Sequence, residues 1–135
     1  MDLEPIETHL RDEDAPDDAV VLLRGGPMVV EKLVEHAFRQ MRDFSWQDQP
    51  MASISVDGTV GGWTEELLLR ERLWSRSNFA RATVGAVRAA GFVVLPTHDV
   101  PHFDVVLAEA SSDEAARLLA VFGPAVNNPY KRRRR

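Results

Sequence analysis

The sequence predicts a single α+β domain, a two-layer α/β sandwich in which helices pack on a sheet of about four strands. Two strand-like runs, residues 92–95 and 102–107, flank a short polar turn and predict a terminal antiparallel hairpin. Apolar residues at helical spacing over about residues 27–43 predict a long amphipathic helix. A mixed order of strands and helices in 135 residues is typical of one domain with one hydrophobic core.

The first half of the predicted fold alternates strands and helices. Residues 19–23, AVVLL, form a short apolar run that suits a buried strand, and Gly25 and Gly26 end it. The long helix is expected to begin near Pro27, because proline is favoured in the first helical turn. Residues 51–57 alternate apolar and polar side chains, which is the period of a half-buried strand.

Two adjacent helices are expected in the middle of the chain. Thr64 is predicted to cap a helix over residues 65–74. Ser77 is predicted to cap a second helix, which ends at Gly91. These two helices separate the alternating strand from the terminal hairpin.

A last helix follows the hairpin. Ser111 and Glu114 have the spacing of a capping box, and Gly123 is placed to end the helix. The predicted order of elements is therefore β-α-β-α-α-β-β-α, with the folded domain over residues 19–124.

Charge is concentrated at the two ends of a chain whose net charge is −5. Residues 1–18 carry eight acidic side chains and one basic side chain, and the last five residues, KRRRR, are all basic. Blocks of like charge repel one another and have little apolar surface to bury. We therefore expect a flexible acidic arm over residues 1–18 and a flexible tail over residues 125–135 that ends in the basic run.

Composition excludes several classes of protein. The chain has no cysteine, which rules out disulfides, a thiolate nucleophile and a cysteine-ligated zinc site. No stretch approaches the roughly 18 uninterrupted apolar residues of a membrane span, and acidic residues stand where a signal peptide would be basic. We therefore expect a cytoplasmic protein.

The nucleotide-binding fingerprints GxxxxGK[ST] and GxGxxG are missing from the sequence, and we assign no cofactor.

The hairpin PTHDVPHFDVVL, residues 96–107, supplies the candidate catalytic residues His98, His102 and Asp104. His102 and Asp104 alternate with apolar residues, so they share one face of a strand, while His98 lies across the turn. Imidazoles and a carboxylate can transfer protons or bind a metal ion. Metal sites usually draw ligands from more than one element, so we assign no metal ligand. A solvated hairpin tip is the alternative interpretation.

A candidate anion site lies at RGGP, between the first strand and the long helix. Arg24, Gly25 and Gly26 stand where the first amides of the helix could bind an anion. The alternative is a tight turn whose glycines relieve backbone strain.

Basic residues later in the chain could bind RNA or another anion. RERLWSRSNFAR places four arginines within twelve residues, which would form a basic ridge if the two predicted helices present them together. The tail joins a tyrosine, able to stack on a base, to the basic run. A solvated helical face is the alternative. The candidates are Arg70, Arg76, Arg81, Tyr130, Lys131 and Arg132.

Three tryptophans and one histidine complete the candidates. Trp46, Trp63 and Trp74 lie near predicted loops or helix ends, where they would serve the core or contact a partner. His36, flanked by charged residues, is expected to be an ordinary surface histidine.

RGGP, the strand SISV and the segment AAGFVVLPTHDVPHFDVVL together resemble a group of small actinobacterial proteins. Those proteins share an LVRGGP-like start and an AAGF-x-LLPT…PHF-x-V-x-L hairpin. The resemblance covers most of residues 20–108, and it implies where the motifs pair but no activity.

A second resemblance is to ADP-ribosyltransferase toxins, in which an arginine, a serine motif and a glutamate surround NAD. Arg24, then Ser53 and Ser55, then Glu109 follow in that order here. The middle threonine of the serine motif and the acidic or amide residue two positions before Glu109 are missing, which puts an NAD site in doubt.

Three functions are therefore carried forward. The first is a small binding or regulatory protein that acts through a protein or nucleic-acid partner, or as a homo-oligomer, with its oppositely charged ends docking that partner. The second is a toxin-like ribonuclease, as in toxin–antitoxin pairs, with His98 or His102 as acid or base and arginines on the phosphate. The third is the NAD-dependent toxin that the second resemblance implies.

Overall fold

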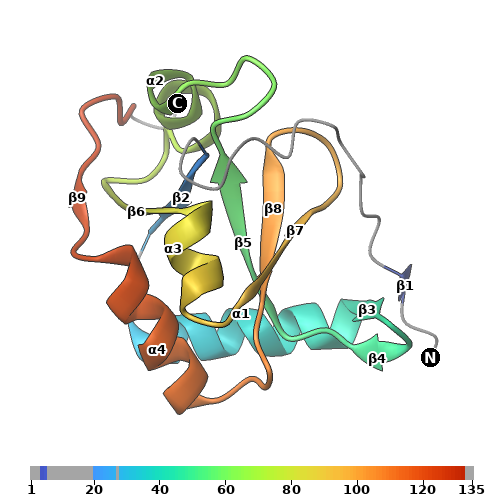
Figure 1. Cartoon of the computed structure of the whole chain (residues 1–135). Helices are drawn as coiled ribbons and strands as arrows, with labels where there is room; N and C mark the ends of the chain where they lie inside the picture. Colours follow the sequence, from blue (N-terminus) through green and yellow to red (C-terminus); the bar gives the residue numbers. More distant parts are fainter. Residues whose placement is uncertain (1–3, 6–19, 27, 133–135) are drawn as a thin grey trace.

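The computed structural model describes residues 4–5, 20–26 and 28–132, and it has the predicted α+β fold (Figure 1). The strands are β1 (Glu4–Pro5), β2 (Val21–Gly25), β3 (Phe44–Trp46), β4 (Gln49–Pro50), β5 (Ser53–Gly58), β6 (Asn78–Thr83), β7 (Val93–Pro96), β8 (His102–Val106) and β9 (Val126–Asn127). The helices are α1 (Val30–Asp43), α2 (Glu65–Leu67), the π-helical turn η1 (Leu68–Arg72), α3 (Val84–Ala89) and α4 (Ser112–Phe122).

One six-stranded antiparallel sheet, in the order β7-β8-β5-β2-β6-β9, organises the fold. Figure 1 shows α3 and α4 together against the sheet, with α1 crossing the lower part of the view. A smaller sheet joins β1, β3 and β4. Among the described residues, no helix has both the length and the apolar character required to cross a membrane.

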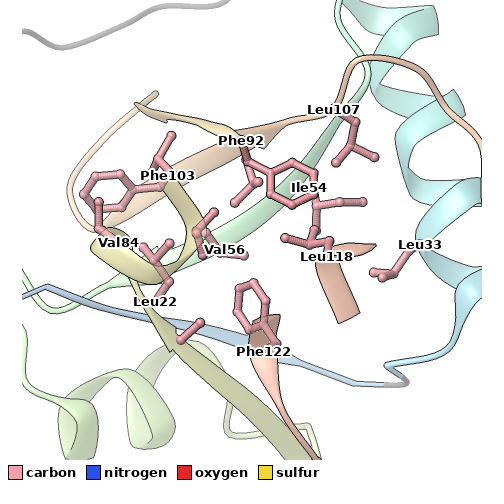
Figure 2. Packing of buried hydrophobic residues seen from close by; sticks show 14 of the residues in the cluster. Leu22, Leu33, Ile54, Val56, Val84, Phe92, Phe103, Leu107, Leu118 and Phe122 are labelled. Carbon is pink, nitrogen blue, oxygen red and sulfur yellow. The ribbon is translucent and has the colours of Figure 1, made fainter. Parts of the chain in front are cut away.

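Two hydrophobic clusters hold the sheet to its helices. The larger cluster packs side chains such as Leu22, Ile54 and Leu118, each no more than 1% exposed (Figure 2). The smaller cluster packs Leu23 against residues of η1 and against Phe79. Consecutive residues of a strand point to opposite faces, so β2 contributes to both clusters. Burying each large apolar side chain contributes about 1.5–3 kcal/mol.

The prediction of a helix that begins after Ser77 is wrong for residues 78–83, because these residues form β6. Residues 79–83 of this strand pair with β2, and the small side chains of Ala80 and Ala82 are buried. Tertiary pairing here overrides the helix propensity of alanine. The helix begins only at α3, where Thr83 is the cap and its Oγ1 accepts a hydrogen bond from the backbone N of Ala86 at 3.1 Å.

The helix predicted over residues 65–74 is shorter than expected. Thr64 does cap it, since its Oγ1 accepts a hydrogen bond from the backbone N of Leu67 at 3.2 Å. The α-helix then changes into the π-helical turn η1, where the N–H of Leu73 donates a hydrogen bond to the carbonyl oxygen of Leu68, five residues earlier. Leu73 turns into the smaller cluster and the helix ends.

Short paired strands lie on both sides of the domain predicted over residues 19–124, and the flexibility of the two ends stays a prediction. Residues 126–132, expected in a flexible tail, form β9 on the edge of β6 and a turn that packs on η1. Asn128 fixes this turn, because its buried Nδ2 donates to the carbonyl oxygens of Leu73 and Arg76 at 2.9 and 3.2 Å. Glu4 and Pro5 pair in parallel with β3; the rest of the predicted acidic arm, Pro27 and residues 133–135 lie outside the described residues.

Candidate functional site

The polar residues of the predicted hairpin meet a polar stripe on the neighbouring strand β5. Ile54 and Val56 belong to the larger core cluster, so Ser53 and Ser55 point to the opposite face. Asp104 on β8 lies directly across from Ser55 in the antiparallel register. The alternation SISV therefore builds the core with one face and the wall of a polar site with the other.

Asp104 is the centre of this site, and its side chain is completely buried. Oδ1 accepts hydrogen bonds from Nε2 of Gln40 at 3.0 Å and from Oγ of Ser53 at 2.9 Å. Oδ2 accepts a hydrogen bond from Oγ1 of Thr97 at 2.6 Å. A buried carboxylate is costly unless such donors satisfy it, and these three hold it in one orientation.

His102 is oriented by the same network. Oγ1 of Thr97 lies 2.8 Å from Nδ1 of His102. A threonine hydroxyl has one proton, and Thr97 donates it to Asp104, so this oxygen accepts from His102. Nδ1 therefore carries the ring proton, and in the neutral ring the lone pair is on Nε2. Burial lowers the pKa of His102, and this effect is larger than the opposing effect of the Asp104 carboxylate. The lowered pKa favours the neutral form of the ring.

His98, the third candidate catalytic residue, stacks edge-on against His102, with ring centroids 5.0 Å apart. One ligand atom from each of His98, His102 and Asp104 lies within 4.8 Å of the others, so the three residues could approach a metal ion. Oγ1 of Thr97, however, occupies the space between Nδ1 of His102 and Oδ2 of Asp104, where a shared ion would sit. We therefore assign this cluster to hydrogen bonding.

A pocket of about 210 Å³, called the arginine pocket below, brings His102 together with three arginines. Arg24 from β2, Arg72 from η1 and Arg76 from the turn before β6 line it, together with Ser55. The guanidinium of Arg24 donates from Nη1 to the carbonyl oxygen of Ser55 at 2.9 Å. Arg24 thus meets Arg72 and Arg76, which are distant from it in the sequence, beside the candidate catalytic histidine.

Two of these arginines form no ion pair among the described residues, although the carboxylate of Asp57 lines the same pocket and partly offsets the lowered pKa of Arg24. Arg72 donates to Oδ1 of Asp57 at 3.0 Å, but Arg24 and Arg76 form no ion pair there. Nε of Arg24 is buried and has no hydrogen-bond partner. Burial, followed by the nearby charge of Arg76, lowers the pKa of Arg24 to about 10. Like charges held together beside an unsatisfied donor are the arrangement that an anion would neutralise.

His36 was expected on the surface, and the structure corrects this. Its ring is half-buried between α1 and β5, where Nε2 accepts a hydrogen bond from the backbone N of Ser55 at 3.2 Å. Burial, helped by the charges of Arg24 and Arg39, lowers its pKa to about 4. His36 therefore acts as a neutral hydrogen-bond acceptor that fixes the strand beside the arginine pocket.

The predicted basic residues separate into several places. Gly25 lines the arginine pocket, whereas the N–H of Gly26 is already donated to the carbonyl oxygen of Asn78 at 3.1 Å. Arg81 does not join the other arginines, because it pairs with Glu65 at 2.7 Å. The two helices that were expected to present these arginines together do not both form, since β6 replaces the first turns of the second helix, and RNA binding by these residues stays a prediction.

Arg70 instead meets the end of the chain. Its guanidinium lies 5.4 Å from the ring centroid of Tyr130, and its carbonyl oxygen accepts a hydrogen bond from Nη2 of Arg132 at 2.8 Å. Arg70, Tyr130, Lys131 and Arg132 line one shallow pocket and are called the C-terminal basic cluster. The hydroxyl of Tyr130 donates to Glu66 at 2.8 Å.

The three tryptophans have different surroundings. Trp46 lines an apolar pocket of about 510 Å³, Trp63 packs on the smaller core cluster, and the guanidinium of Arg132 lies 5.4 Å from the ring centroid of Trp74. Their use as a partner interface stays a prediction. Glu109 lines the pocket of Trp46, away from the pocket of Arg24, so the structure does not assemble the arginine, serine and glutamate expected of an NAD site.

Sequence reasoning missed the residues that orient the site, namely Gln40, Thr97 and the acceptor role of His36. Thr97 lies next to the candidate His98, and Gln40 follows His36 by one helical turn, so spacing places each of them beside another histidine of the chain. What the spacing does not give is the packing of α1 beside β5 and β8. Comparisons with family models, with curated proteins and with solved structures give no match.

Proposed function

We propose that this protein binds single-stranded nucleic acid, with one phosphate group seated in the arginine pocket. The observation that carries the proposal is a surplus of positive charge in one pocket, where Arg24 and Arg76 form no ion pair among the described residues. The carboxylate of Asp57, which also lines this pocket, is already paired with Arg72. Arginine guanidinium groups bind phosphate oxygens through two parallel hydrogen bonds, and a phosphate would supply the missing acceptor for Nε of Arg24.

An extended anion suits the surface better than an isolated phosphate. The turn η1 carries Arg72 in the arginine pocket and Arg70 in the C-terminal basic cluster, so one short element joins the two basic sites. Trp74 and Tyr130 lie beside arginines in this region and offer aromatic faces of the kind on which bases stack. The acidic net charge of the chain confines this attraction to a local surface.

Fluorescence anisotropy with labelled mixed-sequence strands of RNA and of DNA tests the proposal. We expect binding of both strands that weakens steeply between about 50 and 200 mM salt, because phosphate contacts release counterions. Arg76→Gln should weaken binding about tenfold or more, since a charge-assisted hydrogen bond contributes about 1.5–3 kcal/mol. The matched control is Arg81→Gln, because that arginine is also exposed but is paired with Glu65 outside the pocket.

Three outcomes decide between the possible ligands. Salt-dependent binding that Arg76→Gln weakens and Arg81→Gln leaves unchanged supports the proposal. An equal loss of binding affinity in both variants would mean that binding depends only on the total charge of the protein, which contradicts a phosphate bound in the arginine pocket. Thermal stabilisation by inorganic phosphate or a mononucleotide, without binding of either strand, would replace the strand by a small phosphorylated compound as the ligand.

A further inference from the structure

We infer that the protein cleaves RNA, with His102 as the general base that removes the proton from a ribose 2′ hydroxyl. This inference rests on the proposed function, because it places the phosphodiester of the bound strand in the arginine pocket. It goes beyond binding, since it assigns a reaction, a substrate class and a catalytic residue.

The hydrogen-bond chain from Asp104 through Thr97 to His102 carries the inference. Oδ2 of Asp104 accepts the only hydroxyl proton of Thr97, and Oγ1 of Thr97 in turn accepts the Nδ1 proton of His102, over distances of 2.6 and 2.8 Å. The lone pair of the neutral ring is thereby left on Nε2. A general base needs a defined tautomer of this kind, held by a buried carboxylate that also stabilises the protonated ring.

The position of His102 relates this base to the bound phosphate. His102 lines the same pocket as Arg24 and Arg76, so a phosphodiester held by the two guanidinium groups would lie beside the imidazole. The same cations face the negative charge that develops on the phosphorus oxygens during the reaction, where fixed positive charge is most effective. Asp57, which lies across from His102 in the strand register, holds Arg72 at the rim.

The reaction is an internal transesterification. His102 accepts the proton of the 2′ hydroxyl while the 2′ oxygen forms a bond to phosphorus, and the bond from phosphorus to the 5′ oxygen breaks. The departing 5′ oxygen takes a proton from a water molecule, and His102 later returns its proton to the solvent. The products are a 2′,3′-cyclic phosphate and a free 5′ hydroxyl, with no oxidant, reductant or metal ion in the balance.

Thr97 and Asp104 act as positioning residues, and Thr97 offers the sharper test of the chain. Thr97→Ser keeps the hydroxyl and should keep most of the cleavage rate. Thr97→Val has nearly the same shape but cannot accept the Nδ1 proton, so both ring tautomers become available. We expect Thr97→Val to lower the rate and to shift its pH profile, which loss of packing alone would not do.

Cleavage is measured with labelled mixed-sequence RNA at saturating protein in a single turnover, with EDTA present, and with the 2′-deoxy strand as the matched substrate. The full chain should cleave RNA to products that end in a cyclic phosphate and should leave the deoxy strand intact. His102→Gln should lower the rate about 100-fold or more, the usual contribution of a general base. Arg81→Gln should cleave at the rate of the unaltered chain, and thermal unfolding shows whether each variant is folded.

The outcomes separate this inference from the proposed function. A protein that binds the deoxy strand in a salt-dependent way but leaves RNA intact overturns the catalytic inference and leaves the binding proposal in place. A protein that binds neither strand overturns both. An unchanged rate in a folded His102→Gln, or cleavage that EDTA abolishes and that yields 5′ phosphates, removes His102 as the base.

Discussion

The unusual state of His36 leads to a prediction about stability and pH. Its ring is half-buried, and burial, followed by the charges of Arg24 and Arg39, lowers its pKa from 6.5 to about 4. The carboxylate of Asp104 acts in the opposite direction, and His102 adds a smaller lowering effect. These are the charged and titratable groups that act on His36 from β2, β8 and its own helix.

Because folding lowers this pKa, the unfolded chain binds a proton at His36 more readily than the folded chain. Well above pH 6.5 neither state binds a proton at His36, so His36 imposes no penalty there. As the pH falls through the window from 6.5 to about 4, the unfolded state gains protons first, and the free energy of unfolding decreases.

The size of this loss follows from the two pKa values. At about 1.4 kcal/mol per pKa unit, the difference between 6.5 and about 4 sets a ceiling of about 3.4 kcal/mol. Water still reaches one side of the ring and screens the charges around it, so we expect about 1–2 kcal/mol. That is a large part of the stability of an ordinary small domain, about 5–15 kcal/mol.

Urea unfolding at about pH 7 and at about pH 4.5 measures the effect in the unaltered chain and in His36→Gln. Glutamine can still accept the hydrogen bond from the N–H of Ser55 through Oε1, but it does not titrate. The unaltered chain should lose about 1 kcal/mol more than the variant on acidification, since only part of the window is crossed. Equal losses in the two proteins would refute a neutral, partly buried His36.

Three further predictions test the site and the fold. Asp104→Ala should lower the free energy of unfolding by about 3 kcal/mol in urea titrations, because the buried hydroxyls of Ser53 and Thr97 and the half-buried amide of Gln40 lose their acceptor. Asp104→Asn should cost clearly less, and equal costs would contradict the hydrogen-bond network. Thr83→Ala should lower the free energy of unfolding by about 1 kcal/mol, because it removes a helix cap, whereas Ser77→Ala should lower it by under about 0.5 kcal/mol. The reverse order would contradict Thr83 as the cap and favour Ser77, the cap that the sequence predicted. Gly58→Ala should lower the free energy of unfolding by about 1–3 kcal/mol, because the added Cβ would lie 2.5 Å from Cε1 of the buried Phe103. An unchanged midpoint of thermal unfolding would contradict this packing.

The parts of the fold that the sequence predicted well are those with a local cause. The alternation of residues 51–57 corresponds to β5, and the hairpin around the polar turn corresponds to β7 and β8. Ser111 caps α4 as expected, although the carboxylate of Glu114 accepts from the backbone N of Ala108 and does not complete the box. Each of these features depends on residues within one or two turns of the chain.

The segment NFARAT was misjudged because its state depends on a distant partner. Ala80 and Ala82 favour a helix, and only the pairing of β6 with β2 makes a strand the better choice. The same limit applies to the tail, where buried Asn128 finds the carbonyl oxygens of Leu73 and Arg76 more than 50 residues earlier, at separations of 55 and 52. Local propensity carries no information about partners at such distances in the sequence.

The candidate site shows the same division. Alternation along β8 correctly placed His102 and Asp104 on one face, since that depends only on the period of a strand. The approach of α1 with Gln40, and of η1 with Arg72, requires the packing of whole elements. The sequence could therefore indicate the hairpin residues, and Arg24 and Arg76 as separate candidates, but not that these arginines line one pocket with His102.

The burial of Asp104 is best explained by what it orients. Removing a carboxylate from water costs several kcal/mol, and hydrogen bonds from Gln40, Ser53 and Thr97 offset that cost with little net gain in stability. An apolar side chain at this position would fill the space at lower cost. What it would not do is hold the hydroxyl of Thr97 as an acceptor for Nδ1 of His102. The energetic balance thus favours a role in fixing the imidazole beside the arginine pocket over a role in holding the sheet together.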